Sequence, residues 1–145
     1  VIFGRGNNNR IYGGHGNDRI VDGDGSSIIH TGPGRNVVTL SDGDDVVHVG
    51  SGMNQIDAGT GAVVFHIAYG GVTVIRRWGP EMRLNLSAWP RMPEITQMGS
   101  GRVQLRLALS VIDLHGVRDP AGVPAQIDGP VPQPVPKRKK REKSA

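Results

Sequence analysis

The chain has 145 residues with 22 glycines, 10 prolines, no cysteine and only 4% aromatic residues, and its net charge is +4. The absence of cysteine excludes disulfides and thiolate metal sites, and no run of apolar residues is long enough to span a membrane. The charge is uneven, because residues 1–66 carry −3 while residues 67–118 carry +4 and residues 119–145 carry +3. Abundant glycine with few aromatics favours a turn-dense, repetitive architecture over a helical globule.

Residues 13–66 divide into six consecutive rows of nine residues: GGHGNDRIV, DGDGSSIIH, TGPGRNVVT, LSDGDDVVH, VGSGMNQID and AGTGAVVFH. The fourth position is glycine in every row, and the second is glycine in every row except the one that contains Ser41. The eighth position is always apolar, and this phase extends back to Ile2 and forward to Val74. The repeat predicts a short strand and a glycine-rich turn in every row.

Successive rows are expected to lie on opposite sides of a right-handed coil, so that eighteen residues complete one turn of it. Each coil buries its apolar side only by stacking on its neighbours, so at least three are needed. The sequence therefore predicts an all-β fold, a parallel β-roll with two sheets. The expected inward ladders are Ile2, Ile20, Val38, Ile56 and Val74 in one sheet, and Ile11, Ile29, Val47 and Phe65 in the other.

The segment after the repeats predicts a β cap over residues 76–118. Apolar residues alternate with other residues from Val103 to Val111, which is typical of a half-buried antiparallel strand. Such a cap covers an edge of the roll that would otherwise be prone to aggregation. We expect the roll to span residues 1–75, and residues 119–145 to form a Pro-rich linker and a disordered basic tail.

The rows and the closing segment "VTVIRRWGPEMRLNLSAW" resemble the RTX (repeats-in-toxin, hemolysin-type) family, whose motif is GGxGxDxUx. The resemblance implies a calcium-binding module at the C-terminal end of a secreted bacterial protein. It also implies that the chain stays unfolded in the cytoplasm, where calcium is low, and folds in extracellular calcium. In the family, turn carbonyls and the sixth-position aspartates of two turns stacked on the same edge share one ion.

The sixth positions of this chain depart from that pattern. One edge of the roll holds Asp18, Asn36 and Asn54, and the other holds Asn9, Ser27, Asp45 and Val63. No two sixth-position aspartates are stacked neighbours, so most family-type sites are expected to be degenerate. Asn36 and Asn54 are expected to pair with each other and with turn backbone groups, forming an amide ladder that replaces an ion.

The second and fourth rows retain a cluster of acidic side chains. Asp24 and Asp42 are one coil apart, so we expect them about 4.8 Å from each other, a spacing that favours a bound cation. We predict one calcium ion held by Asp24, Asp42, Asp45, Ser27 and turn carbonyls. Asp18 and Asn36 form the second candidate, which gives one or two Ca²⁺ sites in total. The alternative is a solvated acidic cluster without an ion.

His30, His48 and His66 share the ninth position of alternate rows, so they are predicted to stack on the outer face of one sheet. The column can bind a transition metal or sense pH, or it is simply an outward polar column. Ile28, Val46 and Val64 form a parallel apolar column that can pack on a neighbouring domain or another chain.

No HExxH stretch, phosphate-binding loop or nucleophile elbow occurs, so the chain is predicted not to be an enzyme, although it can be the non-catalytic part of one. The rival function is a calcium-independent scaffold or adhesion module that binds an upstream domain or an anionic polysaccharide. Nucleic acid is not expected as a partner, because the basic tail lacks aromatic residues. The candidate polyanion surface consists of Arg76, Arg77, Arg83, Arg91, Arg102 and Arg106.

Overall fold

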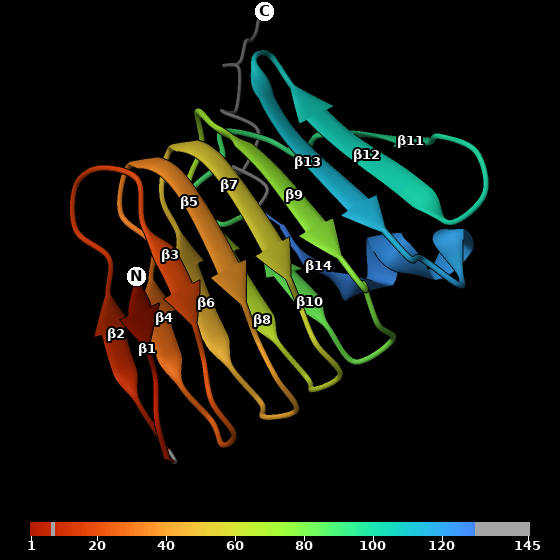
Figure 1. Cartoon of the computed structure of the whole chain (residues 1–145). Coiled ribbons are helices and arrows are strands. Elements are labelled where there is room, and N and C mark those ends of the chain that lie inside the picture. The colour runs from red at the N-terminus through yellow and green to blue at the C-terminus, as the bar shows by residue number, and fades with distance from the viewer. Residues whose placement is uncertain (7, 130–145) are drawn as a thin grey trace, which may run out of the picture.

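Short strands separated by glycine-rich turns wind into a parallel β-roll (Figure 1) in the computed structural model, which describes residues 1–6 and 8–129. The fold predicted from the repeat is confirmed. The first sheet has the order β1 (Ile2–Phe3), β3 (Arg19–Val21), β5 (Gly34–Thr39), β7 (Gly52–Asp57), β9 (Val72–Arg76), β13 (Ser110–His115), β12 (Arg102–Leu107) and β11 (Glu94–Gln97). The second has the order β14 (Ile127–Asp128), β10 (Arg83–Asn85), β8 (Val64–Ile67), β6 (Val46–Val49), β4 (Ile28–His30) and β2 (Arg10–Tyr12).

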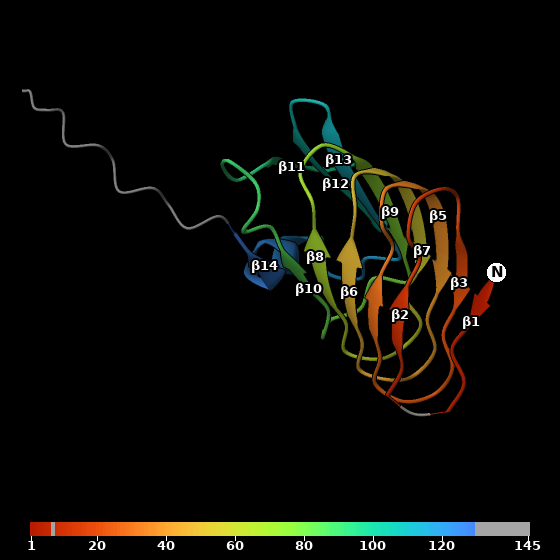
Figure 2. The same cartoon turned by 90° about the vertical axis from the view of Figure 1, so that its left-hand side faces the viewer.

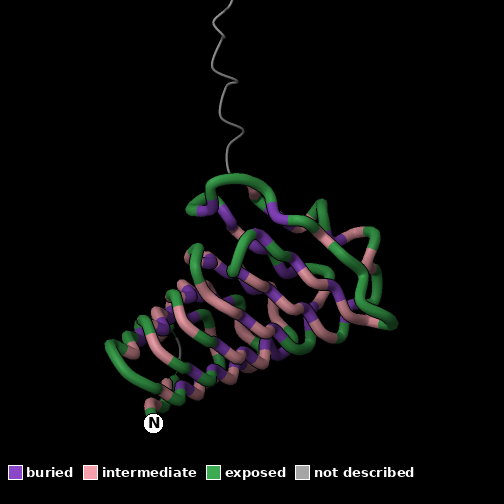
Figure 3. The backbone as a smooth tube through the Cα atoms, turned by 90° about the horizontal axis from the view of Figure 1, so that it is seen from above, coloured by how far each residue is buried: buried purple, intermediate pink, exposed green. Residues whose placement is uncertain are grey.

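The apolar ladders form the core between the two sheets. In the first sheet, Ile20 pairs with Val38 and Val38 with Ile56, all fully buried. Buried segments recur along the inner side of successive coils (Figure 3). Each β-branched side chain therefore packs between its counterparts in the coils on either side.

The predicted ladder is wrong at its last member, because Ile56 pairs with Ile75 and not with Val74. Val49 pairs with Ile67, eighteen residues later, whereas Met53 pairs with Val72, nineteen residues later. One extra residue therefore lies in the turn 68–71. It moves Ile75 into the core and turns Val74 towards the outer face.

Glycine at the fourth position is required because the turns stack backbone against backbone. A Cβ at Gly43 would collide with the carbonyl oxygen of Gly25, and one at Gly61 would collide with that of Gly43. Gly34 and Gly52 also have backbone φ angles of 107° and 110°, which residues other than glycine rarely adopt.

The roll continues past residue 75, so the predicted boundary with the cap is misplaced. Strand β9 runs to Arg76, and β10 adds a further strand to the second sheet, with Leu84 beside Phe65. Strands β13, β12 and β11 extend the first sheet as antiparallel neighbours beyond β9. Leu109 is 90% exposed at the turn between β12 and β13, so the predicted alternation ends at Leu107.

Residues 119–128 were expected to be an extended linker, and this prediction is wrong. Pro120–Gln126 forms a 3-10 helix, and β14 pairs in parallel with β10 at the cap end of the second sheet (Figure 2). The side chain of Gln126 accepts a hydrogen bond from Trp78 Nε1 and donates to the carbonyl oxygens of Gly79 and Met82. These long-range hydrogen bonds hold residues 119–128 against the segment 78–82. The predicted basic tail, residues 137–145, lies outside the described residues.

Candidate calcium-binding edges

The turns of the roll line two edges, which differ in their polar side chains. The acidic edge consists of the turns 22–27, 40–45 and 58–63. The amide edge consists of the turn 13–18 and of residues 31–36 and 49–54, in which a short turn leads into the first residues of β5 and β7. Both edges are built by the glycine-rich halves of the rows, which bring equivalent positions of successive coils into register. Sequence-distant polar groups thus meet at eighteen-residue intervals.

Two carboxylates are buried at the acidic edge beside Ser27. Asp22 is 6% exposed and Asp45 is 1% exposed. The backbone N–H of Ser27 donates to Asp45 Oδ1 at 2.8 Å, and Ser27 Oγ donates to Asp22 Oδ1 at 3.0 Å. The other oxygens, Asp22 Oδ2 and Asp45 Oδ2, are buried and have no hydrogen-bond partner among the described residues. Two carboxyl oxygens without hydrogen-bond partners among the described residues therefore lie within one small cluster.

Burial raises the pKa of Asp45 to about 7 from its ordinary value of 3.8. The hydrogen bond from the Ser27 backbone lowers this pKa, while the negative charges of Asp22 and Asp44 raise it further. Burial removes the water that stabilises a carboxylate, and a second carboxylate nearby adds repulsion. A cation at this point would relieve both effects.

The predicted ligands of the acidic edge separate into two groups. Ser27 and Asp45 lie together in the buried cluster, whereas Asp24 and Asp42 are exposed. Asp42 Oδ1 accepts a hydrogen bond of 2.8 Å from Thr60 Oγ1, and Asp44 Oδ1 accepts one of 3.0 Å from the N–H of Ala62. Asp42 and Asp44 therefore bond to the following turn.

Asp22 is the buried residue that the sequence did not select as a ligand. It occupies the first position of its row, directly after β3, whereas the family motif places its aspartate at the sixth position. The sequence feature that could have identified Asp22 as a ligand is its position directly after a predicted strand, on the same edge as Asp45. Gly4 leaves room for it, because a Cβ there would lie 2.7 Å from Asp22 Oδ1.

The amide edge contains the predicted ladder, which the hydrogen bonds confirm. Asn36 Oδ1 accepts from the N–H of Asp18 at 3.0 Å, and Asn36 Nδ2 donates to Asn54 Oδ1 at 3.0 Å. The two amides also donate to the carbonyl oxygens of Gly32 and Gly50. Asp18 Oδ2 is buried without a partner among the described residues, so this edge has one orphaned oxygen where the acidic edge has two.

The donor set at both edges is made of oxygen atoms, which suits a hard cation such as Ca²⁺. Within residues 1–6 and 8–129, no three His, Asp or Glu side chains are grouped so as to hold a metal ion. The two carboxylates and the hydroxyl of the acidic edge would therefore need turn carbonyls to complete the six to eight ligands that calcium requires.

The repeats match a known family model. The RTX calcium-binding nonapeptide repeat matches in four copies, over residues 1–21 and 21–56. Residues 1–56 therefore carry RTX-type nonapeptide repeats. RTX nonapeptide repeats bind Ca²⁺, occur in secreted bacterial proteins and generally serve as structural modules. The RTX match ends before the turn 58–63, whose sixth position is Val63. No curated protein matches the chain.

The basic surface predicted to bind polyanions is partly neutralised by neighbouring acids. Arg83 forms two hydrogen bonds with Asp128, of 2.9 and 2.7 Å, and Arg102 forms two with Asp113, of 3.2 and 3.0 Å. Arg77 lies 3.3 Å from Asp57. Three of the six candidate arginines are thus in ion pairs with described residues. Among the described residues, no helix is long and apolar enough to cross a membrane.

Proposed function

We propose that this chain is a non-catalytic, calcium-stabilised β-roll module with its principal ion site at the acidic edge, held by Asp22, Ser27 and Asp45. The observation that carries the proposal is the pair of buried carboxylate oxygens, Asp22 Oδ2 and Asp45 Oδ2, without hydrogen-bond partners among the described residues. A buried anionic oxygen without a partner destabilises a fold. A divalent cation shared between the two removes that penalty.

The proposed ion would join two successive coils. Asp22 and Ser27 belong to the turn 22–27, and Asp45 to the turn stacked on it, so bound calcium would neutralise both carboxylates and hold the turns together. Asp24 and Asp42, the exposed acids of the same two turns, remain predicted ligands at the outer side of the ion. Asp18, beside Asn36, is the second candidate position on the opposite edge.

We also propose that calcium controls folding less strictly here than in a roll with aspartates at every turn. The hydrogen bonds that Asn36 accepts from the N–H of Asp18 and donates to Asn54 link the three segments of the amide edge without an ion. These bonds support a roll that is partly stable before calcium binds, and we expect calcium outside the cell to complete its folding. The same bonds are also the observation that favours the rival function, a calcium-independent scaffold for an upstream domain or an anionic polysaccharide.

The test is thermal unfolding followed by circular dichroism, in chelator and in millimolar calcium. We expect calcium to raise the melting temperature of the natural chain and of the E94Q variant, and to leave that of a D22N/D45N double variant unchanged. E94Q is the control because Glu94 is an exposed acid on β11, in neither of the two edges. Equal stability with and without calcium in the natural chain would instead support the calcium-independent scaffold.

A further inference from the structure

The outer face of the second sheet carries a column of four stacked rings. The ring centroids of Tyr12 and His30 are 4.6 Å apart, those of His30 and His48 4.3 Å, and those of His48 and His66 4.6 Å. The interplanar angles are 9°, 4° and 12°. The parallel register of β2, β4, β6 and β8 places each ring directly beside the next.

The two ends of this column differ. At one end, His30 is followed by the exposed Tyr12. At the other, His48 and His66 border a hollow of about 280 Å³ whose lining also includes Asn85 and Ser87. Asn85 is the strand neighbour of His66, and its Oδ1 accepts a hydrogen bond of 3.0 Å from the N–H of Ser87. Only the His48 and His66 end therefore combines two imidazoles with a polar hollow.

We propose that His48 and His66 form a binding site for a borderline divalent transition metal ion such as Zn²⁺, Ni²⁺ or Cu²⁺. Neutral imidazole is a preferred ligand of these ions, whereas calcium prefers oxygen. Water molecules in the hollow, and the side-chain oxygen of Asn85, complete the coordination. The site is separate from both calcium-binding edges, because it lies on the outer face of β6 and β8.

The rings must turn towards each other to share an ion. The lone pair of an imidazole lies in the plane of the ring, so two stacked rings present their lone pairs side by side. His48 and His66 are half-buried on an outer face, so turning them leaves the core between the sheets unchanged. The movement gives up the stacking contact, so moderate affinity is expected.

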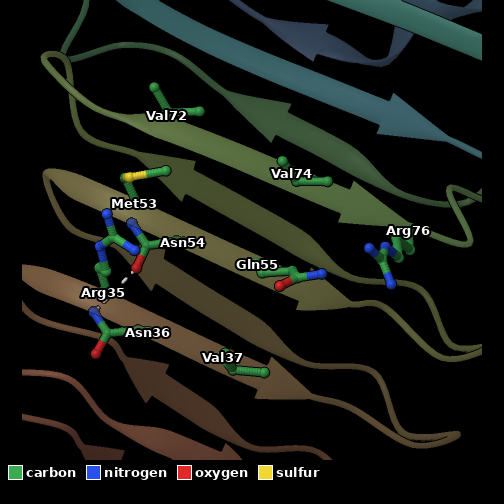
Figure 4. Close-up of a pocket in the computed structure, with 9 residues that line it drawn as sticks. All are labelled: Arg35, Asn36, Val37, Met53, Asn54, Gln55, Val72, Val74 and Arg76. Carbon is green, nitrogen blue, oxygen red and sulfur yellow. Dashed lines mark hydrogen bonds between the residues drawn. The ribbon is translucent and has the colours of Figure 1, made fainter.

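The groove on the outer face of the first sheet (Figure 4) offers no comparable ligand set, since its charged side chains are Arg35 and Arg76.

The test is a calorimetric titration of the full chain with Zn²⁺ or Ni²⁺, in millimolar calcium so that the edges are occupied. We expect H48A and H66A each to weaken binding by about tenfold or more. H30A tests the other histidine pair of the column, since His30 stacks on His48 from the side away from the hollow, and H15A is the control in a turn; both are expected to bind as the natural chain does.

Two results would overturn the assignment: unchanged affinity in H48A and H66A, or an equal loss in H30A. A second measurement does not depend on the folding of the variants. Substoichiometric Cu²⁺ or Ni²⁺ added to the natural chain should broaden the imidazole NMR signals of His48 and His66 before those of His15. Broadening that begins at His15 would contradict the proposal.

Discussion

The backbone N–H of Ser27 donates to Asp45 Oδ1 across two stacked turns, at 2.8 Å. The same bond recurs at the other edge, where the N–H of Asp18 donates to Asn36 Oδ1 at 3.0 Å. A sixth-position side chain thus links its turn to the preceding one, whether it is an acid or an amide. The two side chains differ in their second polar atom, which is an amide nitrogen in Asn36 and a carboxyl oxygen in Asp45. Asn36 Nδ2 donates onward to Asn54, whereas Asp45 Oδ2 is buried without a partner in the described part of the chain.

This difference predicts opposite effects of D45N with and without calcium. In chelator the variant should melt at a higher temperature than the natural chain, because the amide keeps the acceptor for Ser27 and removes a buried charge. In millimolar calcium it should melt lower, because an ion ligand is lost. The measurement is thermal circular dichroism in both solutions. A lower melting temperature in chelator as well would show that Asp45 is stabilising as an anion.

The pH dependence of stability in chelator follows from the pKa of Asp45, which rises from 3.8 to about 7 in the fold. The folded state then binds the proton more tightly than the unfolded chain, so this residue adds stability as the pH falls from 7 towards 3.8. His48 acts in the opposite direction, since its lowered pKa makes the roll lose stability below pH 6.5. Urea unfolding of the natural chain and D45N across this range isolates the first contribution, because only the natural chain has it.

An aspartate at position 36 should restore a calcium site at the amide edge. N36D places two sixth-position carboxylates, those of residues 18 and 36, in stacked turns, and it removes the bonds that Asn36 donates to Asn54 and Gly32. We expect a lower melting temperature in chelator and one additional calcium ion bound by calorimetry. A variant that keeps the natural stability in chelator would show that the amide ladder contributes little.

Backbone stacking of the turns predicts that G43A is strongly destabilising. The added Cβ would collide with the carbonyl oxygen of Gly25, and two backbones would have to separate to admit it. We expect a loss of about 2–3 kcal/mol or more in the free energy of unfolding, measured by urea titration. G79A is the control, because its Cβ would meet nothing closer than Met82 Cε at 3.6 Å. Equal stability of the two variants would contradict close turn stacking.

The C-terminal helix should contribute to stability through one side chain. Q126A removes the acceptor for Trp78 Nε1 and both donors to the carbonyl oxygens of Gly79 and Met82. We expect the free energy of unfolding to fall by roughly 2–3 kcal/mol, whereas Q97A, at an exposed position of β11, should leave it unchanged. Identical urea midpoints would mean that residues 119–128 rest on the roll without stabilising it.

The fold was predictable from the sequence because the nine-residue phase fixes which residues point inward. The nine-residue phase predicts Val74 as the inward residue, whereas Ile75 takes that place because of the extra residue in the turn 68–71. Both residues are apolar, so the sequence pattern does not reveal the shift. The folding of residues 119–128 depends on Gln126 reaching Trp78, a contact 48 residues apart that local composition does not indicate.

The candidate site was predictable only in part, for a similar reason. The motif drew attention to sixth positions and so to Ser27 and Asp45, which the structure brings together. It gave no weight to the first position, where Asp22 is buried, and it could not distinguish Asp22 from the exposed Asp24 two residues later. Burial at the edge depends on how the turns stack, which the sequence pattern does not specify.

The central claim is tested most directly by a crystal structure of the chain grown in calcium, with the ion identified by its anomalous scattering. We predict a calcium ion between the turns 22–27 and 40–45, with oxygens of Asp22 and Asp45 at about 2.3–2.6 Å. An ion found only beside Asp18, or an acidic edge that stays without one at millimolar calcium, would contradict it.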